Sequence, residues 1–323
     1  MRALVCSAWG AVEDLVVGEL PVPVPAATQV LIKVAATAVN FADTIMVGGT
    51  YQTKPPLPFA PGLETAGTVL AVGDKVTRFK PGARVMALLA YGGLAEQALA
   101  EESDTWLIPD GMNFDDAASF PVAYISSDVA LRWMGRLEAG ETLLVLGAAG
   151  GVGLTAVEIG KAMGARVIAA ASTAEKLAAA KSRGADELIN YSEVDLTEAV
   201  MKLTSGRGAD VCFDPVGGDL FDKALSALGW GGRIVLVGFV GGIPKIPANR
   251  LLVKNRSALG SSLRHFRWNA YDKLTVSVET LLQWYGQGKL RPMITREFTL
   301  DEGVAALKML TGRQAMGRIL VRP

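Results

Sequence analysis

The stretch VLGAAGGVGLTAVEIGKAMGARVIAAASTAEK, residues 145–176, carries the clearest structural pattern in this chain of 323 residues. It reads as an apolar strand, a glycine-rich turn, a helix and a second apolar strand. Within the turn, Ala148, Gly150 and Gly153 follow the Gly-x-Gly-x-x-Gly spacing, with alanine at the first place. Small residues there let the backbone turn tightly and approach a pyrophosphate, and the N-terminus of the helix attracts an anion. The stretch therefore predicts a dinucleotide-binding turn.

The pattern on either side of this turn predicts an α/β fold. From about Ala117 onward, apolar strands alternate with helical segments (TLLVLG, RVIAAA, DELINY, DVCFDPV, RIVLVGF), as in a doubly wound parallel sheet. Before it, short Val, Ile and Leu runs separated by Pro and Gly indicate small strands. The tail adds two helical stretches and a last strand, GRILVRP. We predict a β-rich domain from residues 1–121 and 262–323, a nucleotide-binding domain from residues 122–261, and a cleft between them.

The end of the second strand bears on the choice of cofactor. An acid there would hold the ribose of NAD and repel the 2'-phosphate of NADP, but this chain has Ala171. Ser172 and Lys176 follow, a hydroxyl and a cation within one helical turn, and favour NADPH. As an alternative, Ser172 and Glu175 have the spacing of a capping box, and Lys176 would then be a solvated helix residue.

Composition excludes several classes of function. Lys plus Arg equals Asp plus Glu at 32 each, so no nucleic-acid partner is expected. No apolar run is long enough to span a bilayer, and the start lacks a signal peptide, so we predict a cytoplasmic protein without membrane contact. Cys6 and Cys212 lie in apolar runs as expected for buried free thiols. With His265 the single histidine, no metal site is predicted.

Six motifs occur in the order AVNFADTIMVGGTY, PFAPGLETAGTVLAVGDKV, AAGGVG, FDPVGG, VGF and LGSSL. Together they resemble the zinc-free quinone oxidoreductase branch of the medium-chain dehydrogenase/reductase superfamily over essentially the whole chain. The resemblance implies a GroES-like catalytic domain made from both ends of the chain and a Rossmann domain between them. It also implies NADPH in the cleft and a homodimer.

The resemblance also assigns individual residues. Zinc-dependent members carry cysteine and histidine where this chain has Asn40 and Leu63, so reduction of an activated acceptor is a better prediction than alcohol oxidation. Asn40 is expected near the nicotinamide. The remaining expected cofactor contacts are Gly150, Gly151 and Val152 at the pyrophosphate, Ser172, Lys176 and Tyr191 around the 2'-phosphate, Phe239 facing the carboxamide, and Arg318 near the diphosphate. As an alternative, Arg318 is a surface cation on an edge strand.

Tyr51, in GGTY, matches the position of the proposed proton donor of enoyl-thioester reductases in this superfamily. We assign it to the catalytic site with Asn40, although packing of the ring is an equal alternative. Asp43 is read as a solvated or capping acid, Glu64 as a structural hydrogen-bonding residue, and His265 as a surface or packed side chain.

We predict hydride transfer from the reduced nicotinamide to a small quinone or another α,β-unsaturated carbonyl acceptor. One alternative is an enoyl-thioester reductase, although the evenly mixed charge gives no sign of a basic mouth for a phosphorylated carrier. Another is a non-catalytic NADPH-binding structural protein.

Overall fold

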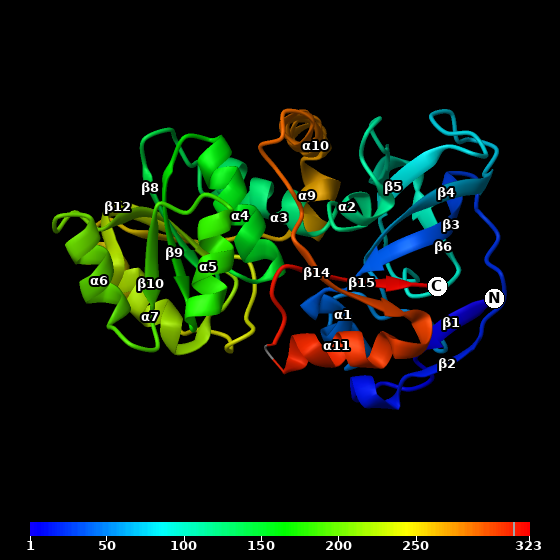
Figure 1. Ribbon diagram of the computed structural model, residues 1–323, viewed down its shortest axis with the longest axis horizontal. Helices are drawn as coiled ribbons and strands as arrows, with labels where there is room; N and C mark the ends of the chain where they lie inside the picture. The colour runs from blue at the N-terminus through cyan, green and yellow to red at the C-terminus, as the bar shows by residue number, and fades with distance from the viewer. Residues whose placement is uncertain (313) are drawn as a thin grey trace. The chain divides into compact units, whose positions relative to one another are not determined.

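The computed structural model describes residues 1–312 and 314–323 (Figure 1). They divide into two compact units. Unit 1 comprises Met1–Val122 and Pro292–Pro323, and unit 2 comprises Ala123–Arg291. Unit 1 therefore contains both ends of the chain, and unit 2 is inserted between them.

The second boundary lies at residue 292, whereas the sequence placed it at 262. Residues 263–286 form two helices, and the longer of them packs within unit 2. Its Leu274 and Leu281 are buried, and Ser277 accepts a hydrogen bond of 2.9 Å from the indole of Trp133. Amphipathic helices after a nucleotide-binding sheet give no local signal of which domain they cover, so packing decides the boundary.

Unit 2 contains a six-stranded parallel sheet in the order β10-β9-β8-β11-β12-β13. By position in the sequence this is the order 3-2-1-4-5-6 of a doubly wound nucleotide-binding fold, as predicted. All five residues of β8 are buried, as expected for a strand covered on both faces. The strands are β8 (Thr142–Leu146), β9 (Arg166–Ala171), β10 (Glu187–Asn190), β11 (Ala209–Asp214), β12 (Leu228–Leu236) and β13 (Ser257–Gly260).

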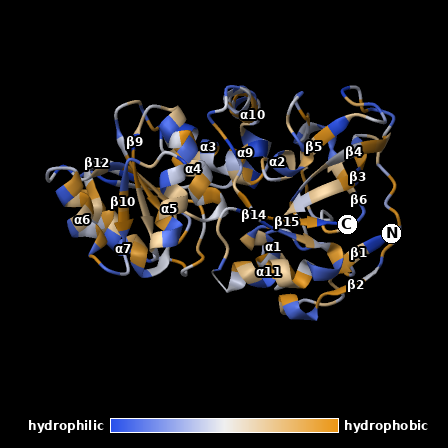
Figure 2. Ribbon diagram, viewed as in Figure 1, coloured by the Kyte–Doolittle hydropathy of each residue, from blue (hydrophilic) through white to orange (hydrophobic). Residues whose placement is uncertain are grey.

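The helices of unit 2 pack around this sheet, and α4 and α5 carry both polar and apolar residues (Figures 1 and 2). Their apolar sides cover the strands, since a helix beside a sheet buries one stripe. The helices are α3 (Ala123–Asp128), η3 (Val129–Met134), α4 (Gly151–Ala162), α5 (Ala174–Ser182), α6 (Leu196–Leu203), α7 (Gly218–Ala227), α8 (Ala248–Val253), α9 (Leu263–Asn269) and α10 (Tyr271–Gly286).

Unit 1 is built on a seven-stranded sheet with the path β14-β15-β3-β4-β5-β7, and β6 pairs with β3. These strands are β3 (Gln29–Ala38), β4 (Glu64–Val72), β5 (Arg84–Leu88), β6 (Gln97–Glu101), β7 (Thr105–Leu107), β14 (Ile294–Thr299) and β15 (Arg318–Arg322). Strands β1 (Arg2–Val5) and β2 (Val16–Glu19) form a separate pair. The helices are η1 (Val12–Asp14), α1 (Phe41–Val47), η2 (Glu102–Asp104), α2 (Phe114–Ala118), η4 (Leu300–Glu302) and α11 (Gly303–Thr311).

The last strand of the chain brings its first residue to the end of β3. β15 pairs in parallel with β14 and antiparallel with β3, where Leu320 lies opposite Ala38. Arg318 therefore starts a strand that has neighbours on both sides, and it is 4% exposed. The alternative interpretation of Arg318 as a surface cation on an edge strand is wrong, because the pairing of the tail with β3 buries it.

Each unit has its own apolar cores. Cys6 and Cys212 are buried free thiols, as predicted. Among residues 1–312 and 314–323, no helix is long and apolar enough to cross a membrane.

Candidate active site

The turn after β8 has the geometry of an anion-binding loop. Gly147 has φ +55°, which favours glycine, and the N–H of Gly150 donates to Gly147 O at 2.9 Å. The N–H of Ala148 donates to Ala170 O at 3.1 Å and ties the turn to β9. Gly150 is the N-cap of α4, so the N–H groups of the first turn of α4 have no intrahelical acceptor and are suited to a pyrophosphate.

Gly153 lets α4 approach this turn closely. A Cβ added at Gly153 would overlap Gly147 O and lie 2.9 Å from Ala148 Cα. Glycine is therefore required for helix–strand packing at the third place of the motif. The predicted motif and its local structure agree.

The loops after β11 and β12 meet at the same edge of the sheet. The N–H of Gly241 donates to Val216 O at 2.7 Å, and the N–H of Gly218 donates to Gly242 O at 2.8 Å. Phe239 lies on the β12 loop and is 44% exposed. The strand order reverses between the neighbouring strands β8 and β11, and dinucleotides bind at this point in such sheets.

Ser172 and Lys176 come together at the carboxyl end of β9. Lys176 Nζ lies 3.5 Å from Ser172 Oγ, and both side chains are half-buried. Ala171 is buried in β9, and its carbonyl oxygen accepts the N–H of Tyr191 at 3.1 Å, which brings Tyr191 to the same edge. The predicted capping box of Ser172 and Glu175 is wrong, because the N-cap of α5 is Thr173.

Thr173 Oγ1 accepts the N–H of Lys176 at 3.3 Å and so caps α5. The signal for a cap was correct in type and displaced by one residue, because Ser and Thr are adjacent and both are good N-caps. Capping therefore does not occupy the Ser172 hydroxyl, which instead faces the Lys176 ammonium.

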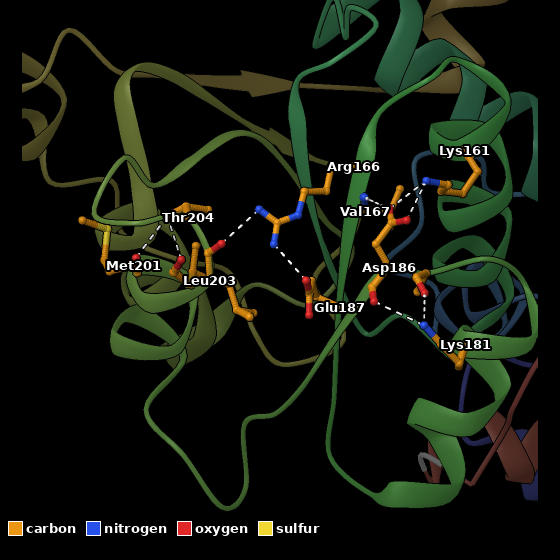
Figure 3. A network of polar contacts seen from close by, with 11 residues as sticks. Lys161, Arg166, Val167, Lys181, Asp186, Glu187, Met201, Leu203 and Thr204 are labelled. Carbon is orange, nitrogen blue, oxygen red and sulfur yellow. Dashed lines mark hydrogen bonds and ion pairs between the residues drawn. The ribbon is translucent and has the colours of Figure 1, made fainter.

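The opposite end of β9 and β10 holds a network of ion pairs (Figure 3). The Asp186 carboxylate accepts from Lys161 Nζ and from the N–H of Val167, both at 2.7 Å, and Arg166 donates to Glu187 at 2.9 Å. Burial alone would raise the pKa of Asp186, but these hydrogen bonds outweigh it and lower the pKa. This network joins β9 to β10 at their amino ends, away from the glycine-rich turn and from Ser172 and Lys176.

In unit 1, Asn40, Glu64 and Arg318 form a buried polar cluster. Asn40 Nδ2 donates to Glu64 Oε1 at 2.8 Å and to Ala38 O at 3.1 Å, and Asn40 Oδ1 accepts from Arg318 Nη1 at 3.2 Å. Arg318 Nη2 also forms an ion pair with Glu64. The other Glu64 oxygen accepts the N–H of Val122 at 2.7 Å. Glu64 has the structural hydrogen-bonding role that was predicted.

Asp43 completes this cluster from the first turn of α1. Its Oδ2 accepts the N–H of Asn40 at 2.7 Å, so it is a capping acid, as one of its two interpretations held, and it is buried rather than solvated. Burial raises the pKa of Asp43 to about 7, with the nearby Glu64 charge adding to the rise, and hydrogen bonding and Arg318 oppose it. Burial also raises the pKa of Glu64 against the charge of Arg318. No local sequence signal links Arg318 to these acids.

The other two residues considered for the site differ in burial. Tyr51 follows α1, is half-buried, and its ring packs against the apolar core that contains Phe59 and Leu63. His265 is exposed, with Nδ1 3.1 Å from Ser262 Oγ and its ring 5.6 Å from that of Trp268, so its interpretation as a surface side chain is confirmed.

Asn40 and Leu63 stand where the resemblance puts zinc ligands, and they do not form a metal centre with their neighbours. Among the described ranges 1–312 and 314–323, no group of three or more His, Cys, Asp or Glu side chains could hold a metal ion. Asn40 uses its amide within the cluster, and the buried Leu63 side chain carries no donor atom. Independence of zinc stays a prediction.

Comparison with known proteins identifies both parts of the chain. Residues 26–110 match the alcohol dehydrogenase GroES-like domain, and residues 151–279 match the domain described as zinc-binding dehydrogenase. The rat quinone oxidoreductase-like protein 2 (Rattus norvegicus) is 38% identical over 295 residues, covering 91% of this chain and 84% of the relative.

Solved structures agree with these matches. The Escherichia coli quinone oxidoreductase complexed with NADPH is 28% identical with a TM-score of 0.94, over 100% of both chains. The CurK enoyl reductase is 27% identical with a TM-score of 0.89, over 99% of this chain and 98% of that chain. With its GroES-like sheet, its Rossmann-type sheet and these relatives, this chain belongs to the quinone oxidoreductase branch of the medium-chain dehydrogenase/reductase superfamily.

Proposed function

We propose that this protein is an NADPH-dependent reductase of quinones or other α,β-unsaturated carbonyl compounds. The choice of NADPH over NADH rests on the residues at the end of β9. Ala171 stands there in place of an acid, and the Lys176 ammonium lies beside the Ser172 hydroxyl. A cation and a hydroxyl at this edge suit a 2'-phosphate, whereas an acid would repel it. The NADPH complex of the E. coli relative supports the same cofactor.

Several of the chain's own groups would hold the cofactor. The first turn of α4, at Gly151 and Val152, offers backbone N–H groups to the pyrophosphate, and Gly153 allows the close approach. Tyr191 lies next to Ala171, on the 2'-phosphate side, and Phe239 lies on the loop expected to face the carboxamide. NADPH supplies a hydride when bound, so the protein's work is to orient the reactants and exclude water.

We expect Asn40 to lie near the nicotinamide as a side chain of fixed orientation. Both Nδ2 hydrogens are used by Glu64 and Ala38, so its amide has no donor left for a substrate oxygen. Arg318 donates to Asn40 and Glu64, and these contacts favour a role in holding Asn40 over the predicted contact with the diphosphate.

Tyr51 is the candidate proton donor, and it distinguishes between substrate classes. A quinone oxygen can take its proton from water, whereas an enone or enoyl thioester needs a proton at the α-carbon. We expect Tyr51→Phe to lower kcat for enones and enoyl thioesters by about tenfold to a hundredfold and to change quinone turnover much less. Equal losses for all substrates would mean that the ring only packs or orients.

Oxidation of NADPH measured against quinones, short enones and enoyl thioesters tests the proposal. A preference for quinones or enones supports it. A preference for enoyl thioesters would favour the second candidate, which the likeness to the CurK enoyl reductase supports. Tight NADPH binding without turnover of any acceptor would favour a non-catalytic protein and overturn the proposal.

We further propose that the protein is a homodimer. β13 ends the sheet of unit 2, and three exposed apolar side chains, Trp230, Leu252 and Val253, lie on the neighbouring segments. A hydrogen bond of 2.8 Å from the Gly231 N–H to Lys254 O links these segments. A strand at the edge of a sheet, with exposed apolar residues beside it, suits pairing with a second copy. Light scattering should give twice the chain mass, and the mass of one chain would refute this.

The cytoplasmic location stays a prediction.

A further inference from the structure

Asp214 is a buried acid at the carboxyl end of β11 that no expected role explains. It is 0% exposed. Its Oδ1 accepts the N–H groups of Val216 and Gly217, both at 2.8 Å. Its Oδ2 is buried and has no hydrogen-bond partner among the residues that the structure describes. Burying a carboxylate costs free energy unless hydrogen bonds compensate. For Asp214, the two N–H groups of the following turn provide these hydrogen bonds.

Backbone hydrogen bonds join the turn of residues 215–218 to the loop after β12. Val216 O accepts from Gly241, and the N–H of Gly218 donates to Gly242 O, at 2.7 and 2.8 Å. The backbone of Asp214 adds a third bond, since its carbonyl accepts the N–H of Val237 at 2.9 Å. The carboxylate therefore holds one loop, and that loop holds its neighbour.

Side chains extend this connection to both expected cofactor loops. A Cβ added at Gly217 would lie 3.3 Å from Phe239 Cδ1, so the turn lies close to that ring. A Cβ added at Gly147 would lie 3.0 Å from Val216 Cγ2, so the same turn also lies against the glycine loop after β8. Movement of residues 215–218 would thus change the place of Phe239 and of the Gly147 turn together.

We propose that Asp214 is a positioning residue for the pyrophosphate and nicotinamide part of the cofactor site, acting through the 215–218 turn on Phe239 and Gly147. This inference rests on the proposed binding of NADPH. The adenosine end, at Ser172 and Lys176, belongs to a separate loop after β9 that none of these bonds reaches. Asp214 should therefore affect the two ends of the cofactor unequally.

Binding of NADPH and of adenosine 2'-monophosphate, which lacks both the pyrophosphate and the nicotinamide half, separates the two ends. In Asp214→Ala we expect NADPH binding to weaken about tenfold, as loss of two side-chain hydrogen bonds to a turn implies. Binding of the monophosphate should change by less than about twofold, because its 2'-phosphate is expected at Ser172 and Lys176 and it has no phosphate for the Gly147 turn. Asp214→Asn keeps an oxygen that can accept both N–H groups, so its NADPH affinity should stay within about threefold of the wild type.

Asp195→Ala is the matched control. Asp195 Oδ1 also accepts a backbone N–H, from Glu198 at 3.1 Å, but it caps α6 away from these loops. This variant should bind both ligands as the wild type does. Circular dichroism confirms that each variant is folded.

Three results would overturn the inference. They are equal weakening of both ligands in folded Asp214→Ala, unchanged NADPH binding in it, or an Asp195→Ala variant that behaves like it. If the wild type binds neither ligand, the proposed NADPH function fails instead, so the two failures are distinguishable.

Discussion

The two polar sites of this protein are built in opposite ways. In unit 2 the candidate phosphate-binding loop is made of backbone, with Gly150 and Gly153 giving space and α4 offering N–H groups. In unit 1 the cluster of Asn40, Glu64 and Arg318 is made of buried side chains that satisfy one another. The first is sensitive to added volume, and the second to a missing charge. Each prediction below tests one side of this contrast.

Arg318→Met should have the largest effect. It removes the cation from a buried Glu64 carboxylate, and an unpaired buried charge costs about 3–5 kcal/mol of unfolding free energy. Urea unfolding measures this. Arg322→Met is the control on the same strand, since the half-buried Arg322 side chain is 39% exposed and pairs with Asp115 and Glu297, so its loss should cost at most about 1 kcal/mol. Equal losses in the two variants would contradict the importance of the buried cluster.

Lys176→Ala tests a charge in unit 2, at the end of β9, where side chains rather than backbone are expected to hold the cofactor. Loss of one charge-assisted contact at a half-buried position, about 1.5–3 kcal/mol, should weaken NADPH about tenfold to a hundredfold and leave NADH nearly unchanged. Lys181→Ala, on the same helix α5, is the control, because Lys181 Nζ bonds the carbonyls of Ala185 and Asp186 instead. The measurement is titration of the wild type and both variants with NADPH and with NADH at one salt concentration, because salt screens such contacts. Weakening of both cofactors alike would refute the 2'-phosphate role.

Gly153→Ala tests volume rather than charge. The added Cβ would overlap Gly147 O, so α4 must shift, at a cost of about 1–3 kcal/mol and with weaker NADPH binding. Gly286→Ala is the control, because Gly286 lies in α10 and its Cβ would meet no atom within 4 Å. That variant should be neutral or slightly more stable. A Gly153→Ala protein as stable as the control would show that the close approach is not required.

The contrast also explains what sequence could predict. The loop at residues 147–153 follows from a local pattern, because each glycine acts on backbone a few residues away, and the alternation of strands and helices in unit 2 is equally local. The bond of Arg318 to Asn40 joins residues 278 positions apart, and only the pairing of β15 with β3 creates it. For the same reason the domain boundary near residue 262 could not be read, since α10 is amphipathic whichever unit it covers. The N-cap at Thr173 was missed by one residue because two capping residues are adjacent.

Asp43→Asn should have the smallest effect below about pH 4, and it tests how the buried cluster in unit 1 responds to titration at higher pH. The pKa of Asp43 rises from its usual 3.8 to about 7 in the folded protein, where it faces Glu64 and Arg318. Below about pH 4 it is protonated in both states. As pH rises from about 4 to about 7, the unfolded chain loses this proton first, so stability falls by at most about 1.4 kcal/mol per pH unit and then levels off. Asp43→Asn should flatten this decline in urea unfolding series between pH 4 and 8.

Glu158→Gln is the companion variant in unit 2, since burial also raises the pKa of Glu158 to about 7. It should remove a separate part of the same decline in stability. If the wild type and Asp43→Asn lose stability in parallel across this range, then Asp43 is ionised in the folded protein at neutral pH, and burial in the cluster around Asn40 does not hold its proton.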